Sequence, residues 1–247
     1  MEFTYQAYRG LLSHLREGGY IFTDYHGYSA HPRCVILRHD IDNSLSQAVR
    51  LAEIEAAEGV HSTWFVLLRT DFYNPASAVS QRQLRRIREL GHELGLHFDE
   101  MAYPQEGANC TIGSSSTEEL IRHEADILSG ICGCPITTVS MHRPYKATLE
   151  ADLKIPGMVN SYGQTFFHDF KYLSDSRRRW REPVEEIIRA GMYDRLHILT
   201  HAFWYHEDEQ DITRSVGDFV RAANAERYGQ MMENITDLPS ILPREVL

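Results

Sequence analysis

Long apolar runs, paired cysteines and an excess of positive charge are all missing from this chain of 247 residues. The apolar runs are short, as in Trp64 to Leu68, whereas a membrane-spanning helix needs about 20 apolar residues. Cys132-Gly133-Cys134 is not a C-x-x-C pair and the other two of the four cysteines are scattered, so we expect free thiols. The sequence therefore predicts neither a transmembrane segment nor a disulfide scaffold.

Acidic residues outnumber basic ones by 35 to 25, which gives a formal net charge of −10 and a pI of about 5.7. This balance argues against nucleic acid as the main partner, because phosphate binding needs a basic face. It also argues against electrostatic docking on anionic membranes. The first residues show neither a basic n-region nor an apolar h-region, so we expect no signal peptide and a cytoplasmic location. The oligomeric state stays open.

Strand-like and helix-like patterns alternate along the chain. We expect strands over 34–37, 62–68, 93–98 and 136–141, with helices over 3–16, 44–59, 80–91 and 116–130. Less regular candidates are strands over 20–24, 159–162, 171–173 and 196–203, and helices over 183–190 and 212–232. Such alternation indicates a parallel sheet with crossover helices. Without a repeat or a linker, one domain over 1–247 is expected, with a long functional loop over 101–115.

Polar side chains that suit a metal follow several of these strands. In parallel α/β folds the working residues lie at the carboxyl ends of strands. The residues found there are Asp40, Asp42, His97, His142, Arg143, Asp175 and His201. Carboxylates and imidazoles are the ligands of catalytic divalent metals. Taken alone, a histidine at a strand end such as His97 is more often a structural residue than a ligand.

Asp40 and Asp42 are two residues apart, so on an extended backbone both face the same side. Two carboxylates that close stay ionised together only beside a cation. A metal held by one, with the other as general base, satisfies this requirement. Alternatively, Asp42 caps the helix that follows.

Three further side chains have a catalytic and a structural interpretation. His201 could act as a general acid, with Asp175 fixing its tautomer and raising its pKa, or it could be a packed core residue. Arg143 could orient Asp40 through a bidentate hydrogen bond, or form a surface ion pair. Trp180 could provide a platform on which a sugar stacks.

Five segments occur in an order that is typical of one enzyme family. They are Leu37-Arg38-His39-Asp40-Ile41-Asp42, Ser62-Thr63-Trp64-Phe65, Gly91-His92-Glu93-Leu94-Gly95-Leu96-His97, His142-Arg143-Pro144-Tyr145, and Asp175 with Trp180 and Leu199-Thr200-His201. The chain thereby resembles the polysaccharide deacetylase family (carbohydrate esterase family 4, the NodB-homology domain) over residues 34–205. It looks closest to the H-D-V-D branch, which includes proteins of bacterial O-antigen loci.

The resemblance implies a distorted (β/α) barrel of about seven parallel strands in a single catalytic domain. It also implies a metal-dependent hydrolase that removes an acetyl group from an N-acylated sugar, a nucleotide sugar or a lipid-linked glycan. Such an activity belongs to surface polysaccharide or O-antigen biosynthesis. Zinc is the metal expected, although aspartate and histidine also accept cobalt, nickel or manganese.

The family's motif positions also imply roles for individual residues. Asp40 is expected to be the base, and Asp42 and His97 metal ligands. Arg143 is expected to position Asp40, and Asp175 to tune His201, which protonates the leaving amine. A backbone N–H near Tyr145 is expected to hold the oxyanion, and Tyr145 and Trp180 to bind substrate.

The chain departs from the family pattern at two points. Ile41 separates the two aspartates, which are adjacent in the family, so the roles of Asp40 and Asp42 could be exchanged. Met101 stands where the family has its second ligating histidine, and a thioether suits a hard or borderline metal poorly. We expect His142 to replace it, with Glu100 and Asp99 as alternatives. Two other hypotheses stay open: hydrolysis of a different amide by the same metal site and, motivated by Met101, a sugar-binding protein without catalysis.

Overall fold

The computed structural model describes residues 1–103 and 116–244, so the expected functional loop lies outside the described residues from 104 onward. The chain divides into two compact units, Met1–Glu207 and Asp208–Leu247. The second contains α8 (Ile212–Met232) and α9 (Leu238–Ile241). The segment 34–205, which carries the motifs, lies entirely in the first unit. A single domain over 1–247 stays a prediction.

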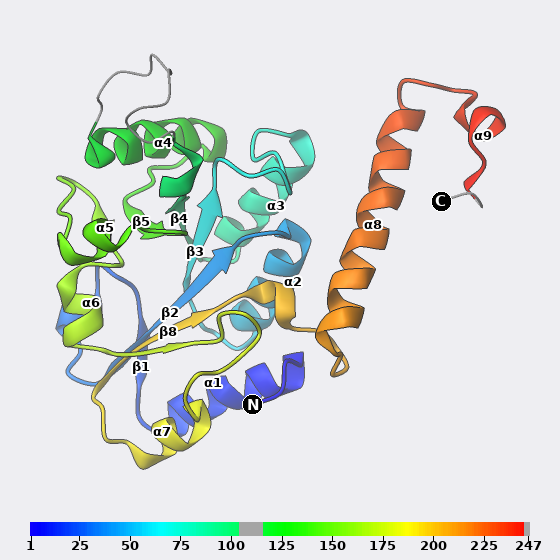
Figure 1. The fold of residues 1–247 in the computed structure, drawn as a ribbon. Coiled ribbons are helices and arrows are strands. Elements are labelled where there is room, and N and C mark those ends of the chain that lie inside the picture. The colour runs from blue at the N-terminus through cyan, green and yellow to red at the C-terminus, as the bar shows by residue number, and fades with distance from the viewer. Residues whose placement is uncertain (104–115, 245–247) are drawn as a thin grey trace. The chain divides into compact units, whose positions relative to one another are not determined.

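The first unit is built on one sheet of eight strands in which every pairing between strands is parallel (Figure 1). The strand order is β6-β5-β4-β3-β2-β8-β7, and β1 also pairs with β2. The strands are β1 (Ile21–Thr23), β2 (Cys34–Ile41), β3 (Thr63–Leu67), β4 (Glu93–Phe98), β5 (Thr138–Met141), β6 (Val159–Asn160), β7 (Lys171–Ser174) and β8 (Arg195–Thr200). The sheet curls into a half-barrel, which confirms the predicted distorted barrel of about seven parallel strands.

Helices connect the strands, as the alternating pattern predicts. They are α1 (Tyr5–Glu17), α2 (Leu45–Ala57), α3 (Ala78–Glu89), α4 (Thr117–Cys132), α5 (Lys146–Glu150), α6 (Gln164–His168) and α7 (Val184–Ala190). The longer ones begin at side-chain caps, and Ser116 and Glu119 form a capping box at the start of α4. In the described parts of the chain no helix is long and apolar enough to cross a membrane.

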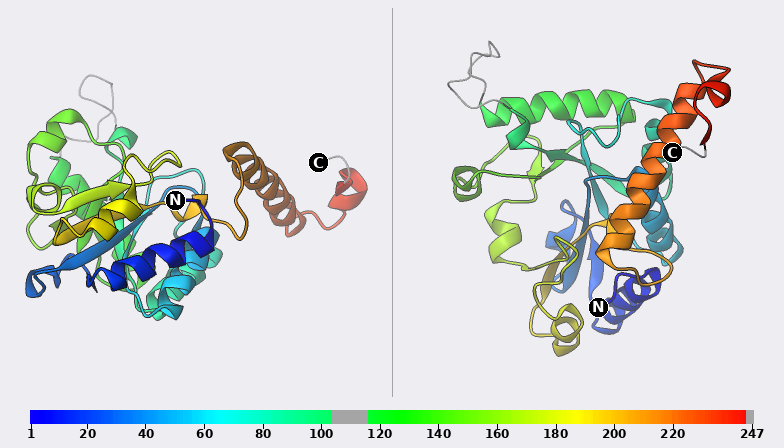
Figure 2. Two further views of the ribbon diagram at one scale, coloured as in Figure 1. Left: turned by 90° about the horizontal axis from the view of Figure 1, so that it is seen from below. Right: turned by 45° about the vertical axis from the view of Figure 1, so that its right-hand side comes forward.

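The two faces of the sheet carry different side chains. On β2, Val35, Leu37 and Ile41 belong to the large apolar core that the sheet shares with its helices, and Figure 2 shows α1 and α2 on that side. Ile36, two positions from Arg38 on the same strand, belongs to a separate aromatic cluster on the inner face. Because side chains alternate along a strand, Arg38 and Asp40 point to the inner face with Ile36. The sequence thus places charged groups inside the half-barrel, towards the carboxyl ends of the strands.

The expected strand over 196–203 ends earlier than its apolar pattern suggests. β8 stops at Thr200, and a short 3₁₀ helix, η3 (Ala202–Trp204), follows. The backbone N–H of His201 donates to both carboxylate oxygens of Asp175 at 3.1 Å. With these hydrogen bonds the backbone of His201 pairs with a side chain instead of a neighbouring strand. They hold His201 at the carboxyl end of the half-barrel.

Candidate active site

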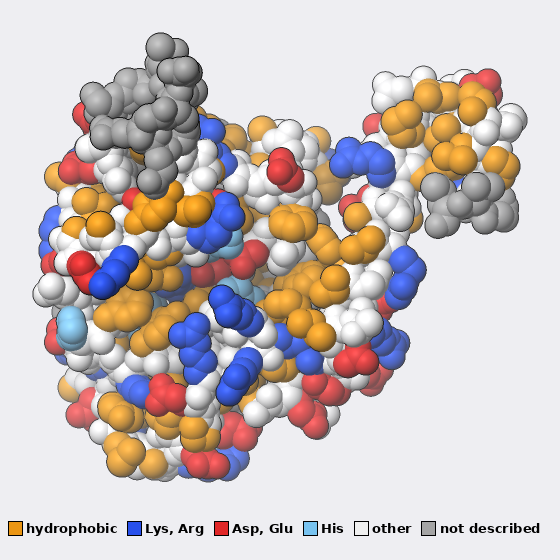
Figure 3. Space-filling model, in the orientation of Figure 1, with side chains coloured by type: hydrophobic (Ala, Val, Ile, Leu, Met, Phe, Trp, Pro, Cys, Tyr) orange, Lys and Arg blue, Asp and Glu red, His pale blue; other side chains and the backbone are white. Residues whose placement is uncertain are grey.

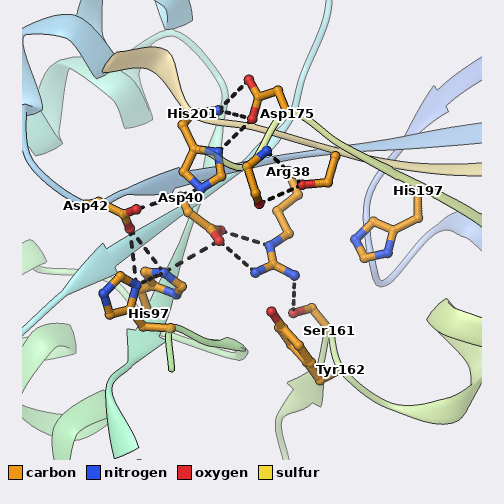
Figure 4. Close-up of polar contacts among 12 residues, drawn as sticks. Arg38, Asp40, Asp42, His97, Ser161, Tyr162, Asp175, His197 and His201 are labelled. Carbon is orange, nitrogen blue, oxygen red and sulfur yellow. Dashed lines mark hydrogen bonds and ion pairs between the residues drawn. The ribbon is translucent and has the colours of Figure 1, made fainter. Parts of the chain in front are cut away.

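The carboxyl ends of the parallel strands bring together residues that lie far apart in the sequence. Figure 3 shows acidic and histidine side chains in a hollow of this face, with lysine and arginine side chains beside it. The residues that converge there are Asp40 from β2 and Asp42 after it, His97 from β4, Asp175 after β7 and His201 after β8 (Figure 4). His142, which follows β5, joins them through its contacts with Asp42 and His97. All six were expected at this position from the sequence.

Asp42, His97 and His142 form a cluster with the geometry of metal ligands. One potential ligand atom from each of them lies within 4.8 Å of the others. His97 Nε2 and His142 Nδ1 face each other at 3.1 Å, and Asp42 Oδ1 lies 3.3 Å from the first and 3.4 Å from the second. His142 thus places a third potential donor beside Asp42 and His97, whereas Met101 is half exposed at the start of the loop.

The protonation and burial of this cluster suit a cation. Burial opposes ionisation of Asp42, but the contacts with His142 and His97 hold its pKa well below the ordinary value. Asp42 Oδ1 is buried and takes part in no hydrogen bond among the described residues, and the same is true of His97 Nδ1. One carboxylate and two imidazoles are a common donor set for catalytic zinc, which leaves a fourth position open. The residues present therefore fit a divalent metal.

His201 and Asp175 form a hydrogen-bonded pair beside the cluster. His201 Nδ1 lies 2.7 Å from Asp175 Oδ1, and Tyr205 donates its hydroxyl to the other carboxylate oxygen at 3.2 Å. Burial disfavours the charged imidazole, but the negative charge of Asp175 and its hydrogen bond outweigh this and raise the pKa of His201 to about 9. His201 Nε2 is 3.7 Å from Asp42 Oδ2, so the protonated ring faces the cluster. This arrangement can donate a proton there.

Asp40 is held by an arginine from its own strand. Arg38 donates from Nε to Asp40 Oδ1 and from Nη2 to Oδ2, both at 2.8 Å. The Arg38 side chain is fully buried and that of Asp40 is 4% exposed. Burial opposes ionisation of Asp40, but the adjacent guanidinium outweighs it and lowers the pKa. Asp40 is therefore a fixed carboxylate beside the cluster, with Oδ2 3.5 Å from His97 Nε2.

This arrangement corrects the contact expected between Arg143 and Asp40. Arg143 instead donates from Nε to Asp99 Oδ1 at 3.0 Å and also bonds the other oxygen, with its side chain 57% exposed. Arg143 follows β5 and Asp99 follows β4, which are neighbouring strands, whereas Asp40 lies on β2. The period of two along β2 could have indicated Arg38, because it shares a face with Asp40.

Glu100 and Asp99, the alternative third ligands, are engaged elsewhere. Asp99 bonds Arg143, and Glu100 accepts hydrogen bonds from the Thr148 hydroxyl at 2.6 Å and from the backbone N–H of Tyr145 at 2.8 Å. The N–H of Tyr145 itself is therefore occupied by a carboxylate, and Glu100 thereby ties the loop after β4 to the start of α5. A backbone N–H near Tyr145 as the oxyanion donor stays a prediction.

The two expected substrate-binding side chains have different surroundings. Tyr145 is half-buried at the position before α5. Trp180 packs half-buried against the main core, and it lines a cavity of about 290 Å³ with Met1 and Val184. Their roles in binding stay predictions. Sequence reasoning did not identify Ser161 and Tyr162, which contact Arg38, because no catalytic motif contains them.

The chain resembles several solved structures, among them members of carbohydrate esterase family 4. A pseudoenzyme of that family from Bacillus anthracis has 14% identity and a TM-score of 0.43, over 79% of this chain and 63% of that one. IcaB from Ammonifex degensii has 16% identity and a TM-score of 0.42, over 59% and 70%. A family 4 acetyl xylan esterase from Clostridium thermocellum, in complex with a cobalt ion, has 13% identity and a TM-score of 0.37, over 78% and 84%.

This chain spans about 63% of the Bacillus anthracis pseudoenzyme and about 65% of a variant of it with restored activity. No family model matches the chain, and no curated protein matches its sequence. The activities in the names above belong to those proteins, and the site of this chain has to be interpreted from its own residues.

Proposed function

We propose that this protein is a metal-dependent hydrolase of the polysaccharide deacetylase type, which removes an acetyl or other acyl group from the nitrogen of a sugar. The observation that carries the proposal is that two charged pairs, His201–Asp175 and Asp40–Arg38, both lie beside one candidate metal position. Asp42, His97 and His142 supply the ligand atoms, and the His201–Asp175 and Asp40–Arg38 pairs flank them. Zinc is the metal we propose, because this donor set is typical of catalytic zinc.

Each residue has a task that its surroundings support. When bound, the metal would polarise the amide carbonyl and make a water molecule more acidic. Asp40 is the base, because Arg38 holds it ionised while each of its oxygens keeps a further lone pair. His201, protonated through Asp175, donates a proton to the leaving amine. Asp175 holds the Nδ1 tautomer, so that Nε2 faces the reaction.

For the substrate we propose an N-acylated sugar carried as a nucleotide sugar or as a lipid-linked glycan. A role in bacterial surface polysaccharide or O-antigen biosynthesis, membership of the H-D-V-D branch and a cytoplasmic location belong to the same proposal. The motifs of residues 34–205 support it.

Release of acetate from a panel of N-acetylated sugars tests the proposal. We expect turnover that a chelator abolishes and that zinc restores, and that Asp40→Asn lowers by about 100-fold or more. Turnover that survives both the chelator and Asp40→Asn would contradict it. Binding of a sugar with no acetate released would favour the non-catalytic alternative, and release of another acyl group would favour the alternative amide substrate.

A further inference from the structure

Two carboxylates, not one, lie within reach of the candidate metal position. Asp40 lies on β2 and Asp42 follows the end of this strand, and the distances from His97 Nε2 are 3.5 Å to Asp40 Oδ2 and 3.3 Å to Asp42 Oδ1. Distance alone would allow either carboxylate to ligate a metal. A second carboxylate ligand would fill the position that a catalytic site keeps open for water or substrate.

The hydrogen-bond partners distinguish the two carboxylates. Both oxygens of Asp40 accept a charge-assisted bond from Arg38, whereas Oδ1 of Asp42 accepts none among the described residues. Bidentate arginine–carboxylate pairs are among the strongest hydrogen-bonded pairs in proteins and fix the orientation of the carboxylate. Asp42 is therefore free to ligate, and Asp40 is held in place.

Arg38 is itself fixed inside the half-barrel. Its guanidinium lies 5.3 Å from the ring centre of Phe65 on β3 and 5.0 Å from that of Tyr162, next to β6. Its third nitrogen, Nη1, donates to the Ser161 hydroxyl at 3.4 Å. The side chain is fully buried, so it cannot exchange Asp40 for water. Without Arg38, a buried carboxylate would lose its partner charge, and a nearby cation would be the best replacement.

We infer that Arg38 is a positioning residue that keeps the Asp40 carboxylate off the metal, so that the centre binds its ion through Asp42, His97 and His142 alone. The inference rests on the metal site of the proposed function, but not on the reaction or on the sugar. It explains how two aspartates with the same reach can serve as a ligand and a base.

Titration of the metal-free, full-length protein with Co²⁺ alone tests this inference in four forms: wild type, Arg38→Met, Asp40→Asn and the double variant. We expect Arg38→Met to bind Co²⁺ about tenfold more tightly. Its visible absorption should weaken, because an additional ligand raises the coordination number. In the Asp40→Asn background the same substitution should change neither the affinity nor the spectrum. Acetate release by Arg38→Met should fall.

Three results would overturn the inference. Arg38→Met could leave the affinity and the spectrum of the wild type unchanged. It could instead raise the affinity equally in both backgrounds, which would indicate only the loss of a positive charge. A wild-type protein that binds no Co²⁺ would contradict this inference and the proposed function together. A protein that shows the expected cobalt results but releases no acyl group would contradict the proposed function alone.

Two further variants separate positioning from folding. Arg69 donates a hydrogen bond to the buried Glu124 at 2.7 Å, away from the candidate metal position. Arg69→Met is therefore a control that also removes an arginine from a buried carboxylate. We expect Arg69→Met to lower stability and leave Co²⁺ binding unchanged. Arg38→Lys keeps the charge but can hold the carboxylate less rigidly, so it should lie between wild type and Arg38→Met. An Arg38→Lys protein identical to wild type in affinity, spectrum and activity would also count against the inference.

Discussion

At the scale of single residues, the site depends on which nitrogen or oxygen is left without a partner. Asp99 and Glu100 are carboxylates close to the mouth of the half-barrel, yet both are fully engaged by hydrogen bonds. By contrast, Asp42 and His142 each have a potential ligand atom that faces the other residue and also faces His97. The sequence could predict His142 as the substitute for a missing histidine. It could not exclude Glu100 and Asp99, because their partners come from other loops.

Replacing His142 should weaken metal binding more than replacing the residue at the family's usual ligand position. We expect His142→Ala to lower zinc affinity by at least about 100-fold, because a donor is lost from a site with three. Met101→Ala, on a half-exposed side chain nearby, is the control and should change the affinity little. Calorimetric titration with zinc measures both. Equal affinities for wild type and His142→Ala would contradict the site.

The Asp175–His201 pair makes a prediction about proton binding. In metal-free protein, NMR titration should give His201 a pKa of about 9, above its ordinary 6.5. Because this pKa is raised, the pair's contribution to stability is complete below pH 6.5 and is lost as the pH rises through about 9. Asp175→Asn should return the pKa towards 6.5 and cost about 100-fold in acyl release. A pKa near 6.5 in the wild type would contradict this.

At the scale of elements, the side of β2 that faces the helices carries a buried polar network. His39 stacks on Trp64, and its Nε2 lies 2.9 Å from Glu55 of α2. Glu55 also accepts hydrogen bonds from the hydroxyl groups of Tyr8 of α1 and of Ser62, each at 2.5 Å. The sequence places His39 at a strand end beside Asp40, where it could be counted with the site. Alternation along the strand places it on the opposite face, where it joins α1 and α2 to the sheet.

Glu55→Gln should destabilise the protein in a pH-dependent way. Burial opposes ionisation of Glu55, but His39 outweighs it and lowers the pKa below the ordinary 4.5. The stabilisation is therefore present above about pH 4.5 and is lost as the pH falls through the lower, folded-state value. At pH 7 we expect a loss of about 3 kcal/mol in the free energy of unfolding.

Urea denaturation at pH 7 and at several acidic values measures this effect. Glu53→Gln, on the same helix in a partly exposed pair with Arg86, is the control and should cost less than about 1 kcal/mol. A loss for Glu55→Gln that is as small as that of the control would show that Glu55 does not anchor α2.

At the scale of the whole molecule, alternating strands and helices were enough to predict the parallel sheet, whereas its curl into a distorted barrel was implied by the family resemblance of the motifs. The spacing of apolar residues predicted the bounds of β2 to β5, and of the helices between them, to within a few residues. It could not give the place of β1, which pairs with the first half of β2 while β3 pairs with the second half. It also could not show that Arg38 and Ser161 meet, since this contact joins positions 123 residues apart across the half-barrel.

All residues of the candidate site lie in the unit Met1–Glu207. We therefore expect a protein truncated after Glu207 to bind Co²⁺ with the affinity and the spectrum of the full chain. Absorption titration of both proteins tests this, with circular dichroism as the check on folding. A folded, truncated protein that has lost the metal would show that residues of Asp208–Leu247 complete the site.

The central claim is that Asp42, His97 and His142 hold a divalent metal. Anomalous difference density at the zinc absorption edge, from crystals of the wild-type protein grown with zinc, tests it most directly. We predict one strong peak with Asp42, His97 and His142 at ligand distances of about 2.0–2.2 Å and with Asp40 still on Arg38. Density at another position, or none at this one with zinc in excess, would contradict the account.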